Sequence, residues 1–193
     1  MTSRSVEISS SKNGDKVKSL IVLFSYHHNN TQKIAQVIAK VLDAQIVNPN
    51  EIDPEELQEY DFVGFGSGIY GDKHHRSLLE LADKLPQVFN KKAFLFSTSG
   101  MSGEEKTVRD HLPLRERLEH KGYIIVDEFN CRGFDTNTSF ESGILLSIVS
   151  WFVQLIGGIN KGRPNSQDLR DAEMFAESIN FQQAQPKENK SYE

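Results

Sequence analysis

Short apolar runs of strand length alternate with longer amphipathic segments along most of this chain. The strand candidates are 20–24, 44–47, 62–66, 93–96 and 123–126, the last with a continuation to 129. Helical periodicity of about 3.6 residues occurs at 31–42, 77–85, 107–121 and 168–179, and a short helix start lies at 53–57. Continuous apolar runs fit strands that are buried on both faces. The alternation predicts an α/β domain with a parallel sheet between two layers of helices.

The length of 193 residues fits one domain with extensions. We expect the domain at 19–181, between polar disordered tails at 1–18 and 182–193, with a helical insert at about 137–156. Segment 1–18 lacks the apolar stretch of a signal peptide or anchor, and no run reaches the roughly 20 residues of a transmembrane span. From the absence of these signals we expect a cytoplasmic protein.

Composition excludes several classes of function. The net charge of −5 argues against a protein that coats nucleic acid. The single cysteine, Cys131, excludes an intrachain disulfide and a zinc site built from several cysteines, and it has no CxxC partner. No Ser-His-Asp set that would indicate nucleophilic catalysis is evident.

The first loop after an apolar run, 25–31, contains Ser, Tyr, His, Asn and Thr but no acidic residue. In an open parallel sheet, ligands bind beyond the carboxyl ends of the strands. This loop leads directly into a predicted helix, whose N-terminal N–H groups favour a phosphate. The absence of GxxxxGK[ST] and GxGxxG patterns argues against a nucleoside triphosphatase or a dinucleotide site. The alternative is that Asn30 or Thr31 only caps the helix.

The loops after the next two buried runs, 67–76 and 97–103, are also small and polar. In the first of them, glycines flank Ile69 and Tyr70, so the backbone can approach a flat ligand closely and the two side chains can cover a ring. The other loop offers hydroxyl and backbone groups for the edge of a heterocycle. Together the three loops predict one planar, phosphorylated ligand.

The chain resembles the flavodoxin family from about 20 to about 179. The motifs that carry the resemblance are 24–31 (FSYHHNNT), 66–70 (GSGIY), 73–75 (KHH), 131–136 (CRGFDT) and 156–165 (IGGINKGRPN). The first motif, 24–31, departs from the family's usual Ser-x-Thr-Gly-x-Thr pattern. Tyr26 stands where Ser or Thr is common, and Asn29 stands where Gly is common. Asn tolerates left-handed backbone better than most residues.

The resemblance implies a flavodoxin-like, three-layer, doubly wound α/β fold, with five parallel strands in the order 2-1-3-4-5, and it implies bound FMN. It places the phosphate in the first loop, on Ser25, His27, His28, Asn29, Asn30 and Thr31. It places the flavin ring between Ser67, Gly68, Ile69 and Tyr70 on one side and Ser97, Thr98, Ser99 and Gly100 on the far rim, with Phe134 and Asp135 as neighbours.

Flavin carries its own redox chemistry, and the protein tunes it. A glycine peptide beside the flavin N5 could turn its carbonyl toward the reduced ring; Gly68 is the first candidate and Gly71 the second. A carboxylate nearby, such as Asp72 or Asp135, would disfavour an anionic reduced ring and lower the potential. A histidine that protonates nearby would do the opposite.

We therefore expect an FMN-binding electron-transfer protein or a small flavin reductase component, working with a redox partner protein or a small-molecule electron donor. One alternative is a flavodoxin fold that binds no flavin and serves as an interaction module. Another is an NAD(P)H-dependent quinone reductase, which requires a nicotinamide site that no motif indicates.

Two histidine pairs, 27–28 and 74–75, raise the question of a metal site. Adjacent side chains point in different directions, and the first loop offers no acidic ligand or cysteine, so we expect no metal. Contact with phosphate or flavin is the expectation for the first pair, and a solvated surface or a partner contact for the second.

The segment 142–159 is the most apolar part of the chain, with no charge from 143 to 160. A helix without charges is expected to be buried. It could pack on its own domain or lie at a membrane surface, but a homodimer contact is the favoured interpretation.

Overall fold

The computed structural model describes residues 17–26, 29–101, 103–133 and 161–184. His27, His28, Phe134, Asp135, the apolar insert with its expected dimer contact, and nearly all of both expected tails lie outside these ranges.

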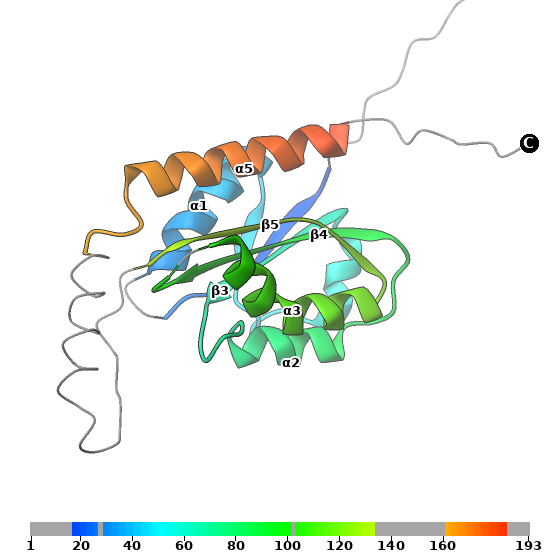
Figure 1. Cartoon of the computed structure of the whole chain (residues 1–193). Coiled ribbons are helices and arrows are strands. Elements are labelled where there is room, and N and C mark those ends of the chain that lie inside the picture. Colours follow the sequence, from blue (N-terminus) through cyan, green and yellow to red (C-terminus); the bar gives the residue numbers. More distant parts are fainter. Residues whose placement is uncertain (1–16, 27–28, 102, 134–160, 185–193) are drawn as a thin grey trace, which may run out of the picture.

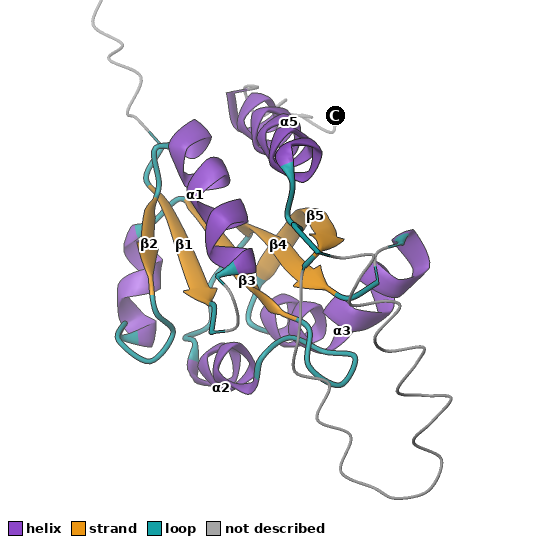
Figure 2. Cartoon of the chain, turned by 90° about the vertical axis from the view of Figure 1, so that its left-hand side faces the viewer, coloured by secondary structure: helices purple, strands orange, loops and turns teal. Residues whose placement is uncertain are grey.

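Five parallel strands form one sheet in the order β2-β1-β3-β4-β5, as expected. The strands are β1 (Ser19–Phe24), β2 (Gln45–Val47), β3 (Phe62–Gly68), β4 (Lys91–Ser99) and β5 (Tyr123–Arg132). The helices are α1 (Asn30–Leu42), the 3₁₀ helix η1 (Pro54–Glu59), α2 (Arg76–Lys84), α3 (Glu104–His120) and α5 (Ser166–Ala184). Figures 1 and 2 show α1 and α5 on one face of the sheet and α2 and α3 on the other. The chain thus has the flavodoxin-like three-layer architecture.

Side-chain alternation along the strands divides the core in two. On β1, Leu20 and Val22 belong to the cluster with α2 and α3, whereas Ile21 and Leu23 belong to the cluster with α1 and α5. Successive strand residues point to opposite faces, so a continuous apolar run fills both clusters.

Glycines in β3 make room for two phenylalanine rings of β4. A Cβ added at Gly64 would stand 2.2 Å from the ring of Phe94, and one added at Gly66 would stand 2.1 Å from the ring of Phe96. Real Cβ atoms do not approach other heavy atoms this closely, so these glycines are required by core packing.

Strand β4 is longer than the expected 93–96, because polar residues continue its ladder. Ser67 pairs with Ser97 and Gly68 with Thr98 across β3 and β4. Ser97 and Thr98 therefore belong to the sheet rather than to a loop, and their side chains point to opposite faces. Likewise α3 begins at Glu104, three residues before the expected start, with Gly103 as its N-cap.

Candidate functional site

The N-terminus of α1 is built to receive an anion. Its N-cap, Asn29, has φ 53° and ψ 29°, the left-handed conformation expected for this position. The first turn holds no acidic residue, and Ser25 Oγ accepts a hydrogen bond from the Gln32 N–H at 3.3 Å. The partial positive charge of a helix N-terminus is therefore not offset by any local carboxylate.

Contact between Thr31 and Thr98 joins this helix start to the sheet. Their Oγ1 atoms lie 2.8 Å apart and both residues are buried. Thr98 is near the carboxyl end of β4, so this bond holds the first and third loops side by side. From the sequence we expected the loops to converge at this edge of the sheet, without singling out these two residues.

One pocket gathers residues from all three loops. Of the residues expected at the site, it is lined by Ser25, Asn30, Thr31, Gly68, Ile69, Tyr70, Thr98, Ser99 and Gly100. Tyr26 and Gly133 also line it, although they were not expected there. Tyr26 is 76% exposed. A large aromatic side chain in a loop of small residues was the signal that could have drawn attention to it.

Ser67 and Ser97 do not line this pocket. Both are fully buried, and they point toward α2 and α3, away from the pocket wall. The expectation that they face the ring is thus not met, because strand geometry continues past the apolar runs and alternates the side chains. Asn29 shapes the first loop through its backbone but is likewise outside the lining.

The segment from Ile69 to His74 is a tight hairpin beside the pocket. Ile69 and His74 form an antiparallel bridge, and the Tyr70 N–H donates to the Lys73 carbonyl at 2.8 Å. At its tip Gly71 and Asp72 both have φ 57°. Two consecutive residues with positive φ are typical of the type I′ turn, in which Gly and Asp are favoured.

The peptide between Gly68 and Ile69 is fixed at both ends. Ser67 Oγ donates to the Gly68 carbonyl at 2.7 Å, and the Ile69 N–H donates to the Thr98 carbonyl at 3.0 Å. Rotation of this peptide would break both bonds, so Gly68 is the wrong choice for a turning carbonyl. The Gly71–Asp72 peptide has no hydrogen bond to any residue that the structure describes, which favours Gly71 instead.

In the second histidine pair His74 is buried and His75 is half-buried, which corrects our expectation of a solvated surface. His74 is 1% exposed and its Nδ1 lies 2.9 Å from Ser67 Oγ. His75 caps α2 by accepting the Ser77 N–H, and its ring stacks on Phe24 with centroids 3.6 Å apart. Both imidazoles are thus used to hold the β3–α2 loop against the sheet.

Ser67 fixes the tautomer of His74. The Ser67 hydroxyl donates to the Gly68 carbonyl and accepts from the His75 N–H at 3.0 Å. His74 Nδ1 must then carry the proton and donate to Ser67, which leaves Nε2 buried with no hydrogen-bond partner among the described residues. Burial, followed by the charge of nearby His111, lowers the pKa of His74 well below its usual 6.5.

A second buried chain of polar groups lies beside the first and was missed at the sequence level. Ser97 Oγ is 2.7 Å from His111 Nε2, and His111 Nδ1 is 3.2 Å from Glu128 Oε2. Asn130 Nδ2 donates to Ser97 Oγ at 2.7 Å, and Arg115 Nε donates to Glu128 at 2.8 Å. The residues come from β4, α3 and β5, so no local motif announces them.

This Ser-His-Glu order does not make a nucleophile. Ser97 and His111 are fully buried, so no substrate reaches the hydroxyl. Burial, the largest influence on Glu128, acts to raise the pKa of its carboxyl, but the hydrogen bonds and charges of His111 and Arg115 outweigh it and hold that pKa below its usual value. The chain of bonds therefore stabilises an ionised carboxylate between α3 and β5.

We predict that stability falls as the pH drops below about 6.5 because of His74. The unfolded chain binds a proton on this imidazole while the folded chain does not, so the free energy of unfolding falls by up to about 1.4 kcal/mol per pH unit. Urea unfolding between about pH 7 and pH 5 measures this slope. His74→Asn should flatten the slope, whereas His120→Asn, a change at an exposed histidine, should leave it unchanged. An equal slope in His74→Asn would contradict the assignment.

A family model described as a flavodoxin domain matches residues 21–132, more than half of the chain. The chain belongs to the flavodoxin domain family. An uncharacterised protein of Methanocaldococcus jannaschii is 42% identical over 163 residues, which cover 84% of this chain and 98% of that protein.

Solved structures agree with the fold of this flavodoxin domain. A flavodoxin from the domain Archaea has a TM-score of 0.56 at 17% identity and covers 86% of this chain and 97% of its own. Oxidised flavodoxin 2 of Bacillus cereus has a TM-score of 0.59 at 20% identity and covers 86% and 99%. Within the ranges described here, no helix has the length and apolarity needed to cross a bilayer.

Proposed function

We propose that this flavodoxin domain binds FMN non-covalently and carries electrons, either as an electron-transfer protein or as a small reductase component. The observation that carries the proposal is the pocket that joins the α1 N-terminus to the glycine-bounded ends of β3 and β4. Members of the flavodoxin family typically bind FMN. An anion site and a wall suited to a flat ring thus lie in one hollow.

The residues present fit the cofactor. The Asn30 and Thr31 backbone and the Ser25 hydroxyl would hold the phosphate, with His27 and His28 of the same loop proposed as further contacts. Gly133 packs closely against two other residues of the lining, because a Cβ there would stand 3.0 Å from Asn30 Nδ2 and 3.2 Å from Thr98 Cβ. A side chain at Gly133 would press on both of them.

We propose that the loops around this hollow adjust when FMN binds. The hollow measures only about 50 Å³, which is less than a tricyclic ring needs. The walls are short loops after β1, β3 and β4, and loops are the parts of a fold that adapt most readily. We expect the loop with Tyr26 and the hairpin with Tyr70 to part and then to cover the ring with their aromatic side chains.

FMN supplies the one- and two-electron chemistry when bound, and this chain supplies position and electrostatics. The Gly71 carbonyl is the candidate acceptor for the flavin N5–H. Thiol chemistry is not part of the proposal, because Cys131 is buried and burial raises the pKa of its thiol far above the usual range. The electron donor is proposed to be a partner protein or a small molecule.

We predict that FMN-loaded protein is reduced by dithionite under anaerobic conditions and does not consume NADH or NADPH at a catalytic rate. Stopped-flow absorbance of the flavin bands measures both reactions, with free FMN as the control. Rapid reduction by NADPH followed by transfer to a quinone would contradict the carrier role and identify a quinone reductase. Protein that takes up no FMN would instead support the interaction module.

A further inference from the structure

A second cavity lies between α3 and β5. It measures about 630 Å³, against about 50 Å³ for the proposed FMN pocket, and sites for ligands commonly measure about 300–1,000 Å³. Residues of α3, the N-cap Gly103 and the run 125–130 of β5 line it. The loop between β4 and α3 connects the two sites, because Gly100 lines the FMN pocket and Gly103 lines this cavity.

This cavity follows the outer edge of β5. Side chains of a strand alternate between the two faces of the sheet, so a cavity that touches six consecutive residues does not lie on one face. Ile125 packs against the core cluster on the α2 and α3 side, whereas Val126 and Phe129 pack against the cluster on the α1 and α5 side. β5 is the last strand in the sheet order, and no described strand pairs with its outer edge. We call this cavity the β5 groove.

Negative charge predominates in the β5 groove. Three carboxylates line it, those of Glu104, Asp127 and Glu128. Arg115 also lines it but binds Glu128, with Nε 2.8 Å from Oε1, and so neutralises that carboxylate. Glu104 and Asp127 form no ion pair with any residue of the described ranges. Two carboxylates are therefore left for a cation from outside the protein.

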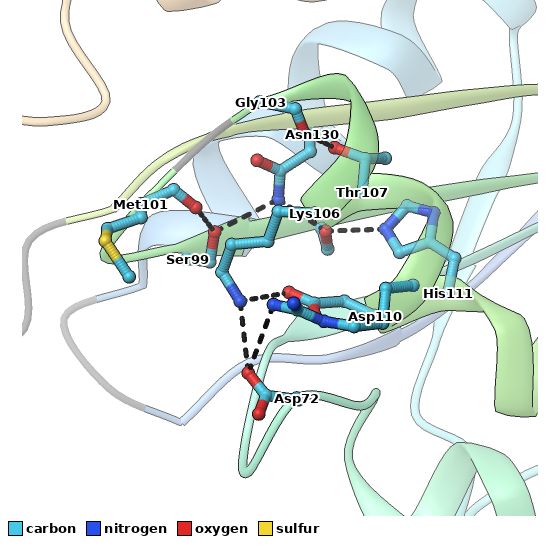
Figure 3. Close-up of polar contacts among 11 residues, drawn as sticks. Asp72, Ser99, Met101, Gly103, Lys106, Thr107, Asp110, His111 and Asn130 are labelled. Atoms are coloured by element: carbon cyan, nitrogen blue, oxygen red, sulfur yellow. Dashed lines mark hydrogen bonds and ion pairs between the residues drawn. The ribbon is translucent and has the colours of Figure 1, made fainter.

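The hydrogen-bond donors of the lining are already engaged. The Thr107 hydroxyl donates to the Gly103 carbonyl at 2.9 Å. Asn130 Nδ2 donates to Ser97 and to Ser99, at 2.7 and 3.3 Å. Figure 3 shows the bonds of this amide on its nitrogen, and its buried oxygen has no hydrogen-bond partner in the part of the chain that the structure describes. What the groove offers to a partner is thus acceptors, which call for N–H groups.

Apolar side chains line the β5 groove between its polar groups. Val108 of α3 is 48% exposed, and Ile125, Val126 and Phe129 of β5 are partly buried. Apolar surface of this kind is covered when a partner docks. A partner that fits the groove therefore combines positive charge with apolar side chains.

An extended cationic segment fits this edge better than a second copy of the chain. An extended chain can lie along an edge strand and direct its alternate side chains to each face. Two copies that paired through β5 would bring Asp127 and Glu128 of one near those of the other, and like charges opposite each other are destabilising. The charges and the bulge at Val126 also discourage pairing with a neutral strand. These repulsive features favour a positively charged partner.

We propose that the β5 groove is a docking site for a partner protein that presents an extended segment in which lysine or arginine side chains are interspersed with apolar ones. The cations pair with Glu104 and Asp127, and the apolar side chains cover Val108 and Phe129. The site does not depend on FMN and goes beyond the proposed redox function. The shared loop between β4 and α3 places such a partner beside the proposed FMN pocket.

Titration of the full chain with defined peptides tests this site. The probe is a hexapeptide of alternating lysine and valine. Its controls are a lysine–serine hexapeptide, which keeps the charge, and a glutamate–valine hexapeptide, which reverses it. We expect saturable binding of the lysine–valine peptide, at least about tenfold tighter than that of the lysine–serine peptide, and no binding of the glutamate–valine peptide. The NMR shifts of backbone amides should be confined to 103–108 and 125–130.

Variants of the lining identify the contacts. Asp127→Asn keeps an acceptor for the Glu128 N–H, which Asp127 Oδ1 binds at 2.8 Å, and Glu104→Gln changes an exposed side chain, so both should fold. Each should weaken binding of the lysine–valine peptide about three- to fivefold, the effect of an exposed ion pair. Glu119→Gln, at an exposed position of α3 outside the groove, should leave it unchanged. Val108→Ser should reduce the preference for valine over serine in the peptide.

Three results would overturn the proposal. Equal binding of the two lysine peptides, or equal losses in all three acidic-residue variants, would show charge attraction without a site. Absence of saturable binding would show that the groove takes no such segment. Shifts of the 125–130 amides that depend on protein concentration without peptide would assign the groove to a second copy. FMN uptake is measured separately, and its failure would overturn the proposed function alone.

Discussion

Asn30→Asp is expected to weaken FMN binding by about 100-fold, which corresponds to about 2.7 kcal/mol. Asn30 lines the pocket as the first residue of α1, whose first turn holds no acidic residue. A carboxylate there would face the phosphate, and two like charges 4 Å apart cost about 4 kcal/mol at an effective dielectric constant of 20. Isothermal titration with FMN and with riboflavin measures the effect. Riboflavin lacks the phosphate, so its affinity should change little.

The substitution separates binding from folding. A carboxylate at an exposed helix N-terminus stabilises the helix by about 0.3–1 kcal/mol, but Asn30 is only 7% exposed. Urea unfolding of the cofactor-free variant therefore measures its stability separately, and the comparison of FMN with riboflavin isolates the effect on the phosphate. Gln36→Glu makes the same amide-to-carboxylate change at an exposed position of the same helix and should leave both affinities unchanged. Equal losses for FMN and riboflavin would show that the phosphate does not lie at Asn30.

Gly66→Ala is expected to destabilise the fold by about 3 kcal/mol, the upper part of the range for inserting one methyl group into a packed core. The added Cβ would stand 2.1 Å from Phe96 Cζ and 2.4 Å from both Cε atoms. For a chain of this length, the thermal midpoint should fall by about 6–12 °C. Circular dichroism during heating measures this shift.

Phe96→Leu should partly rescue Gly66→Ala, because the shorter side chain gives up the space that the new methyl group needs. We expect a favourable coupling of at least about 1 kcal/mol between the two changes in urea unfolding. Gly100→Ala is the matched control, since a Cβ there meets nothing within 4 Å, and it should stay within about 0.5 kcal/mol of the wild type. Strictly additive losses would contradict the packing argument.

The architecture and the meeting of the three loops were predictable from the sequence. The run at 20–24 was apolar throughout, and the structure buries its alternate residues in two clusters. Parallel strands bring their carboxyl ends to one edge, so the loops after β1, β3 and β4 were expected to lie together. The left-handed conformation of Asn29 was likewise expected from its residue type.

Side-chain direction at the strand ends was not predictable from composition. Ser67 and Ser97 looked like loop residues, but hydrogen bonds in the sheet ladder carry β3 and β4 past them and turn both hydroxyls inward. We also expected His74 to be solvated. Its burial depends on a contact with Ser67 of β3, which the local sequence does not show. Gly66 was taken as part of a flavin motif, whereas its lack of a side chain accommodates Phe96.

Long-range polar partners were also beyond the sequence. Lys106 and Asp72 are separated by 34 residues and meet only when α3 packs beside the β3–α2 loop. His111, Glu128 and Asn130 converge on Ser97 from two elements in the same way. Such contacts depend on the three-dimensional packing of whole helices and strands, which periodicity does not specify.

Titration of the purified, cofactor-free protein with FMN tests the central claim most directly. Flavin fluorescence and visible absorbance report on the uptake. Our account predicts saturation at one FMN per chain, with quenched fluorescence and shifted flavin bands, and with inorganic phosphate as a competitor. A linear fluorescence response with no saturation, identical to that of FMN in buffer, would contradict it.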